Sequence, residues 1–382
     1  MRKLRCILLV FIYLFFYITG CDKVDKTGID HADTSPPELK DHPVYKNYNF
    51  SHSHKVIDMG VQPFWVPTSN ISEIMRIDDI LREELDALGY RLNVFPFFKG
   101  NDINYFLKSG DLEIGIGGDM PAIRAAASDE VAIISIIQEG PVSIVSRDLG
   151  EVRMLKGKTV AYPLGSNAHF YLLNTLRKNS VNISEVKLVQ LDVPDMPEAL
   201  HEGRIDAFAA WEPTPAIALD RYNNLMITHR GKSYGFLYVK KDLLDRSPEI
   251  VYHLLASEIR ALRWLKKNDR NLHISSKMLI DASLVLTSQG IPLTVEQISD
   301  LAKKDLPRIH IKNYPRIPAD LLSQHGMLKK EYEFLKNLGL ISQDKTWEEI
   351  KIKFDLNAIE TVISAPLKYR LFEKINFGSH TE

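Results

Sequence analysis

Short apolar segments alternate along the chain with segments of helical periodicity. The apolar runs predict buried β-strands at residues 56–61, 92–95, 112–116, 158–162, 186–191 and 205–211. A helix is predicted after the first strand by apolar residues at Ile77, Ile80, Leu81, Leu85 and Leu88. Gly89 then stands where a helix-ending glycine belongs. Strands that alternate with helices in this way predict an open, mostly parallel sheet with helices on both faces.

Two parts of the chain repeat one local pattern. Residues 107–114 and 200–207 each combine the end of a helix, a glycine (Gly110 or Gly203) and the start of a strand. This repeat predicts two similar doubly wound α/β lobes. We expect lobe 1 at residues 56–145 and 230–382, including a mostly helical C-terminal region, and lobe 2 at residues 146–229.

The N-terminus has the composition of an export signal. Arg2, Lys3 and Arg5 precede an apolar core at residues 6–18, and small residues follow before Cys21. The cysteine after Thr-Gly resembles the lipobox of bacterial lipoproteins, which implies that Cys21 is lipidated. We therefore expect a signal peptide at residues 1–20 and a flexible tether at 21–55. The rest of the chain would then be extracytoplasmic and anchored to the inner membrane, facing the periplasm in a Gram-negative host.

Composition excludes several classes of function. The 382 residues include 48 Lys and Arg against 49 Asp and Glu, a formal net charge of −1 without the basic excess typical of nucleic-acid binding. Two cysteines, Cys6 and Cys21, are too few for a zinc cluster or a disulfide framework. No nucleophile elbow, P-loop or His-Glu-x-x-His motif occurs. We therefore predict a monomer that is not an enzyme and holds no metal or cofactor.

Candidate chemistry lies where the predicted strands end, since ligands of open α/β sheets bind beyond the carboxyl ends of strands. Helix N-termini at these junctions offer unpaired N–H groups that bind small anions. Ser166 could cap its helix or donate to a ligand, and His169 could donate or pack. Trp211 could stack on a ligand or fill the core. Glu212 could pair with a ligand cation, cap its own helix or hold a hinge.

Four motifs follow one another along the chain. They read Gly-Gly-Asp-Met-Pro-Ala at 117–122, Leu-Lys-Gly-Lys-Thr-Val-Ala at 155–161, Gly-Ser-Asn-Ala-His at 165–169 and Asp-Ala-Phe-Ala-Ala-Trp-Glu-Pro at 206–213. In this order and spacing they resemble the nitrate/sulfonate/taurine-type substrate-binding proteins of ABC importers, which have the type II periplasmic-binding-protein fold. The resemblance extends over residues 56–341.

The resemblance implies a receptor that captures a small anionic or zwitterionic solute between its lobes and delivers it to an ABC permease with its ATPase. The residues that would line the cleft are Gln62, Gly118, Asp119, Met120, Ser143, Ser166, Asn167, Ala168, His169, Trp211 and Glu212.

One departure leaves the ligand open. Phe-Trp-Val-Pro at 64–67 replaces the small residues that the family often has after the first strand. An aminosulfonate would satisfy both the helix N-termini and Glu212, whereas nitrate would leave Glu212 without a ligand role. A pyrimidine or flavin precursor would instead stack on Trp211 or Trp65. A ligand sensor, and less favourably an enzyme, are the alternatives on the same fold.

Overall fold

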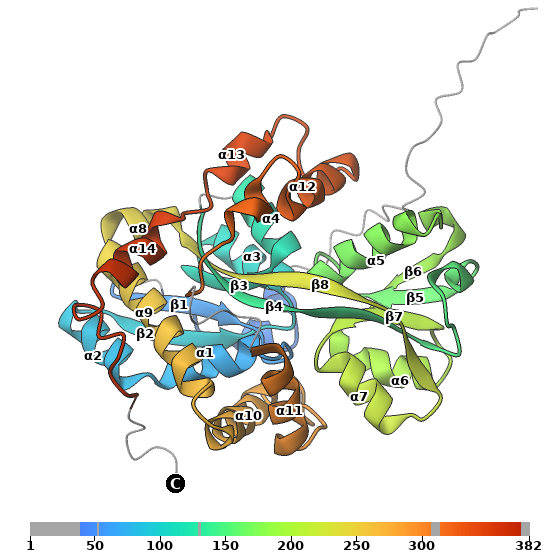
Figure 1. Ribbon diagram of the computed structural model, residues 1–382, viewed down its shortest axis with the longest axis horizontal. Helices are drawn as coiled ribbons and strands as arrows, with labels where there is room; N and C mark the ends of the chain where they lie inside the picture. The colour runs from blue at the N-terminus through green and yellow to red at the C-terminus, as the bar shows by residue number, and fades with distance from the viewer. Residues whose placement is uncertain (1–38, 52, 129–130, 307–313, 376–382) are drawn as a thin grey trace, which may run out of the picture.

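The computed structural model of the protein describes residues 39–51, 53–128, 131–306 and 314–375 (Figure 1). In this part of the chain, eight strands form one sheet in the order β2-β1-β3-β8-β4-β7-β5-β6. Helices cover both faces of the sheet, and two lobes lie on either side of the crossing strands β4 and β8 (Figure 1). The predicted α/β fold with two lobes is confirmed.

Lobe 1 is built on three parallel strands. They are β1 (Val56–Val61), β2 (Arg91–Pro96) and β3 (Ile114–Gly118). The helices that connect and follow them are α1 (Thr68–Ile77), α2 (Asp79–Ala87), α3 (Gly100–Ser109) and α4 (Asp119–Ser128). The helical periodicity at 77–88 predicts α2, but α1 was not predicted.

Lobe 2 repeats this construction. Its parallel strands are β5 (Thr159–Tyr162), β6 (Lys187–Gln190) and β7 (Ala207–Trp211). Its helices are α5 (Asn167–Lys178), α6 (Met196–His201) and α7 (Thr214–Arg221). Gly110 and Gly203 end matching helices with φ of +83° and +77°, as the sequence repeat predicts.

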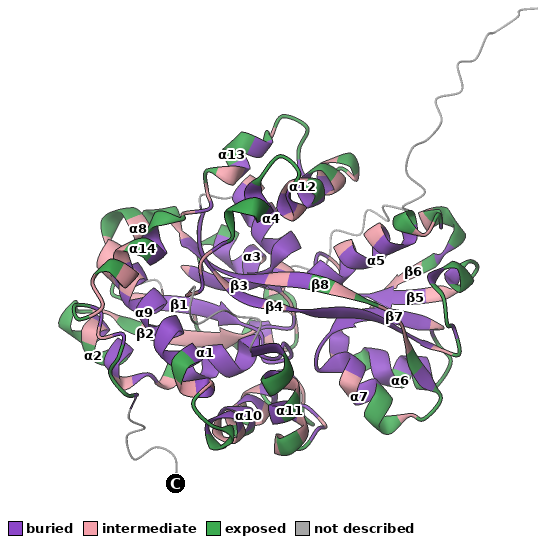
Figure 2. Cartoon of the chain, in the orientation of Figure 1, coloured by how far each residue is buried: buried purple, intermediate pink, exposed green. Residues whose placement is uncertain are grey.

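Two long antiparallel strands connect the lobes. They are β4 (Val131–Arg147) and β8 (Leu225–Lys240), which pair with each other from one end to the other. In lobe 1, β8 pairs with β3 from Gly235 to Val239, and in lobe 2, β4 pairs with β7 from Val142 to Ser146. β4 is buried along nearly its whole length (Figure 2). The chain thus crosses between lobes only within a paired ribbon in the part that the structure describes.

The C-terminal region is helical, as predicted. Its helices are α8 (Lys241–Arg246), α9 (Pro248–Leu265), α10 (Asp269–Ser283), α11 (Val295–Asp305), α12 (Met327–Asn337), α13 (Trp347–Lys351) and α14 (Asn357–Ser364). α9 and α10 pack on α1, and α12 and α13 pack on α4, so this region belongs to lobe 1. None of the described helices is both long and apolar enough to span a bilayer.

The segment before the first strand differs from the predicted tether. Tyr45 is only 2% exposed, and its hydroxyl donates to Asp102 at 2.8 Å. Tyr48 and Phe50 contact Phe95 on β2. Because these rings bury apolar surface on lobe 1, residues 39–50 belong to the folded body and the tether predicted at 21–55 is too long. Residues 1–38, with the predicted signal peptide and Cys21, lie outside the described residues.

A buried ion pair fastens the C-terminal region to lobe 1. Arg260 on α9 donates to Asp78 through Nε at 2.9 Å and Nη2 at 2.7 Å, and both side chains are at most 1% exposed. Arg260 also donates through Nη1 to the carbonyl of Tyr369 at 3.0 Å. Asp78 in turn caps α2 by accepting from Ile80 N. One guanidinium therefore joins α2, α9 and the C-terminal segment.

We predict that Arg260→Met lowers the free energy of unfolding by about 3–5 kcal/mol, because it leaves the Asp78 carboxylate buried without its cation. The exposed pair between Lys241 and Asp245 provides the control. Lys241→Met should change the free energy by less than about 1 kcal/mol. Urea denaturation of both variants checks this, and equal effects would contradict the role given to Arg260.

Candidate functional site

The predicted site residues converge where the two lobes meet. In lobe 1, β1 and β3 are parallel, and in lobe 2, β5 and β7 are parallel. The carboxyl ends of these four strands lie near the junction of the lobes, where ligands of such sheets bind. Five predicted residues line one small cavity there with Trp65, namely Gln62, Gly118, Ser166, Asn167 and Trp211. This inner cavity is too narrow for a water molecule.

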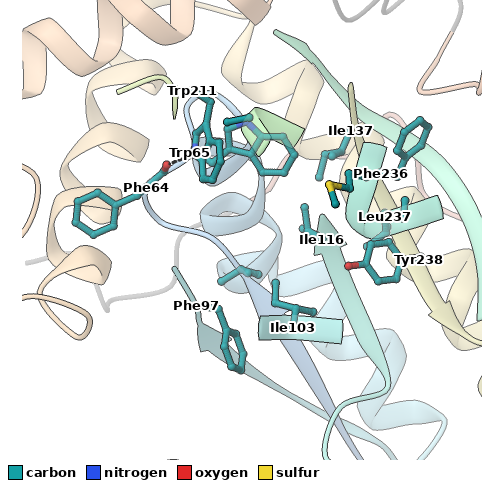
Figure 3. Close-up of a cluster of buried hydrophobic side chains, with 14 of the residues drawn as sticks. Phe64, Trp65, Phe97, Ile103, Ile116, Ile137, Trp211, Phe236, Leu237 and Tyr238 are labelled. Carbon is teal, nitrogen blue, oxygen red and sulfur yellow. Dashed lines mark hydrogen bonds between the residues drawn. The ribbon is translucent and has the colours of Figure 1, made fainter. Parts of the chain in front are cut away.

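The inner cavity is narrow because the lobes touch around it. The indole N–H of Trp211 donates to the carbonyl of Phe64 at 2.6 Å, and the rings of Trp65 and Trp211 lie 6.4 Å apart (Figure 3). A Cβ placed on Gly118 would lie only 3.0 Å from Asn167 of lobe 2. The buried indole N–H of Trp65 has no acceptor among the described residues. The residues around the inner cavity thus form a packed interface between lobe 1 and lobe 2.

Ser166 and His169 have local roles. The Ser166 hydroxyl accepts from His169 N at 3.2 Å and donates to the carbonyl of Pro163 at 2.7 Å, so it caps α5 as the sequence suggests. The His169 ring stacks on Tyr162 with a centroid distance of 4.4 Å. Burial, with a smaller contribution from Arg124, lowers the pKa of His169 to about 4. The ring is therefore neutral near pH 7.

Asp119 joins the end of β3 to the crossing strand β8. Its carboxyl accepts from the backbone N–H groups of Tyr234 at 3.1 Å and Met120 at 3.0 Å. Burial raises the pKa of Asp119 to about 7. Met120 and Ala168 are also buried, and none of these three side chains lines the inner cavity. They hold the lobes' strand ends in place.

A much larger groove lies between the lobes on another side of the junction. It has a volume of about 1070 Å³, with α7 of lobe 2 on one side, α11 of lobe 1 on the other, and residues of β4 and β8 at its floor (Figure 1). Glu212 lines it, as do apolar residues from both lobes. We call this the outer groove.

A cation that the sequence analysis missed lies at the floor of the outer groove. Arg230 on β8 donates through Nε to the hydroxyl of Ser143 on β4 at 3.0 Å and through Nη2 to Glu212 at 3.0 Å. Glu212 is 5% exposed and also accepts from Ala216 N at 3.1 Å. Burial raises the pKa of Glu212, and Arg230 opposes this shift. Glu212 therefore caps α7 and pairs with Arg230, while Ser143 orients that arginine.

No group of three or more His, Cys, Asp and Glu side chains within the described ranges is arranged to hold a metal ion.

Solved structures of two proteins named as binding sulfonates have the same fold as this chain. The aliphatic sulfonate-binding protein SsuA of Escherichia coli superposes with a TM-score of 0.59 at 18% identity, over 78% of this chain and all of that one. SsuA of Xanthomonas axonopodis pv. citri gives 0.61 at 18% identity, over 80% and 99%. The desulfurisation enzyme DszB has the same fold with a TM-score of 0.51, so the fold alone does not separate binding from catalysis.

Residues 99–270 match the sequence model of the family described as NMT1/THI5 like. The taurine-binding periplasmic protein of Escherichia coli is 27% identical over 190 residues, which cover 45% of this chain and 59% of the relative. A putative aliphatic sulfonates-binding protein of the same organism is 31% identical over 119 residues, covering 30% and 37%. The chain thus spans less than two thirds of either relative, and the predicted resemblance is confirmed.

We predict that Gly118→Val separates the lobes, because its side chain would collide with Asn167 across the interface. Overpacking of this kind costs about 1–3 kcal/mol, which the lobes relieve by moving apart. The radius of gyration from small-angle scattering should therefore rise. Gly150→Val is the control, since a Cβ at Gly150 meets nothing within 4 Å. Equal radii for the two variants would contradict a close contact at Gly118.

Proposed function

We propose that this protein is an extracytoplasmic receptor that binds a sulfonate-like solute between its two lobes and delivers it to an ABC permease. The observation that carries the proposal is the outer groove, which both lobes enclose and which has the Arg230 guanidinium at its floor. A sulfonate offers three oxygens that accept from such a donor. The fold supplies the means of capture, because two lobes joined by a paired ribbon close on a ligand by a hinge.

The relatives support the same ligand class. Two of them are named as binding taurine and aliphatic sulfonates, and the superposed SsuA structures are named as binding sulfonates. These relatives in sequence are binding proteins, so we propose no catalytic step. Stacking of a heteroaromatic ligand on Trp211 is not favoured, because this indole is 2% exposed and packs against Phe64 and Trp65.

Binding should be measured on the full chain in detergent by isothermal titration calorimetry. We expect one site per chain and a dissociation constant near 1 μM or below, equivalent to about 8 kcal/mol, for at least one of taurine, ethanesulfonate and hexanesulfonate. Hexanol is the control, since it keeps the tail without the anion. Absence of heat with all three sulfonates, together with binding of a pyrimidine precursor, would contradict the proposal.

We also propose that Cys21 carries a lipid that anchors the mature chain to the outer face of the inner membrane. The basic start, the apolar core and the lipobox-like residues before Cys21 support this. We expect mass spectrometry of the mature protein to find Cys21 as an acylated N-terminal residue. Cys21→Ala should keep the chain unacylated. A mature chain that begins elsewhere, or a free Cys21 thiol, would contradict lipid anchoring.

A further inference from the structure

The Arg230 side chain has a hydrogen-bond donor that can bind a ligand. Its Nε and Nη2 groups bond to Ser143 and Glu212, whereas no residue within the described ranges accepts from Nη1. The side chain is 43% exposed, and it faces the outer groove. Arginine presents its donors in a planar fork that suits the oxygens of an oxyanion. The Arg230 guanidinium is thus fixed in position by Ser143 and Glu212, and its Nη1 group can still donate to a ligand that enters the groove.

A second cation faces the groove from α11 of lobe 1. Lys304 on α11 lines the outer groove. Lys304 has no ion pair or hydrogen bond to the residues that the structure describes, whereas its neighbour Lys303 pairs with Asp269 at 2.8 Å. Arg230 on the crossing strand β8 and Lys304 on α11 of lobe 1 thus offer positive charge from two sides of the groove.

The remaining wall has both acidic and apolar parts. Among the lining carboxylates, Asp220 is engaged by Gln297 at 2.6 Å, while Asp300 and Asp305 lie along α11. The apolar lining consists of Leu219, Ile227, Leu293 and Leu301, with side chains from both lobes. Leu219 is 36% exposed, so a ligand tail that covered it would remove apolar surface from water.

We propose that Arg230 and Lys304 form the anion subsite of this receptor and that Glu212 occupies Arg230 until the ligand displaces it. This rests on the proposed function and assigns its specificity. The sulfonate accepts from Arg230 in place of Glu212 and attracts Lys304, while the tail lies on the apolar wall. The anion then bridges the crossing strand β8 and α11 of lobe 1, while its tail contacts residues from both lobes.

The two possible roles of Glu212 predict opposite effects of its replacement on the affinity for sulfonates. If Glu212 held a ligand amine, replacing it would weaken binding of aminosulfonates only. As a competitor for Arg230, it opposes the binding of every sulfonate. Glu212→Gln keeps an oxygen that accepts from Ala216 N, so α7 stays capped while the competing charge is removed.

The test is a titration of full-chain variants with hexanesulfonate, which has no amine, with melting temperatures recorded to confirm folding. We expect Arg230→Gln to weaken binding about 10- to 100-fold, the range for a hydrogen-bonded charge. Lys304→Gln should weaken it about fivefold and Glu212→Gln should strengthen it about fivefold, as for an ion pair of about 1 kcal/mol. Hexanesulfonate should bind wild type more tightly than ethanesulfonate, by about fourfold per buried methylene.

Lys232→Gln is the matched control, since Lys232 also lies on β8 and pairs with Glu139, but it does not line the groove. It should leave the affinity within twofold. Unchanged affinity in Arg230→Gln, with loss of binding in Gln62→Ala at the inner cavity, would overturn the subsite while leaving a sulfonate receptor in place. Weaker binding in Glu212→Gln would overturn the competitor role. Failure of wild type to bind any sulfonate would instead refute the proposed function.

Discussion

The pairing of β4 with β8 is the constraint on which the rest of this structure depends. The two strands run antiparallel through both lobes, so each lobe's parallel strands attach to the same ribbon. A paired ribbon resists stretching because its backbone groups are bonded across it, yet it twists and bends where the register shifts. Shifts of this kind occur along β4 between Ile133 and Ser135 and between Ile136 and Gln138. The ribbon therefore holds the lobes in contact and leaves bending as their relative motion.

The position of the charges follows from this ribbon. Cross-strand pairing places Arg230 directly opposite Ser143, and the next strand brings Glu212 to the same place. A cation fixed at the junction of the lobes is suited to sense a ligand that touches both of them. The inner cavity is different, because aromatic rings and backbone contacts fill the space between the lobes there. The junction of the lobes is thus packed at the inner cavity and open at the outer groove.

Local features of the sequence predicted much of the fold. The glycines that end α3 and α6, the cap at Ser166 and the short strands of both lobes depend on neighbouring residues, so their patterns were visible. The long strand β4 was not predicted, since Gly140-Pro141 in its middle has the composition of a turn. The aromatic segment around Tyr45 reads as a tether because its packing partners, Phe97 and Asp102, lie more than fifty residues further along the chain.

In the candidate site, too, features that depend on neighbouring residues were predicted and those that depend on distant residues were not. The strand-end motifs located the junction of the lobes, but spacing could not tell which side of it stays open. Arg230 was not predicted as a site residue, because its partners Ser143 and Glu212 are 87 and 18 residues away in the sequence. The pairing of β4 with β8 and with β7 brings the three side chains together. Lys304 reads as one of many surface lysines until α11 is seen to face α7 across the groove.

The most direct measurement is amide hydrogen exchange of the full chain with and without a saturating sulfonate, since it reports which elements a ligand stabilises. A ligand held between the lobes in the outer groove should slow exchange in both α7 (Thr214–Arg221) and α11 (Val295–Asp305), while α2 (Asp79–Ala87) on the far side of lobe 1 stays unchanged. Protection confined to one lobe, or absent from both helices while the ligand is bound, would contradict a receptor that holds a sulfonate between its lobes.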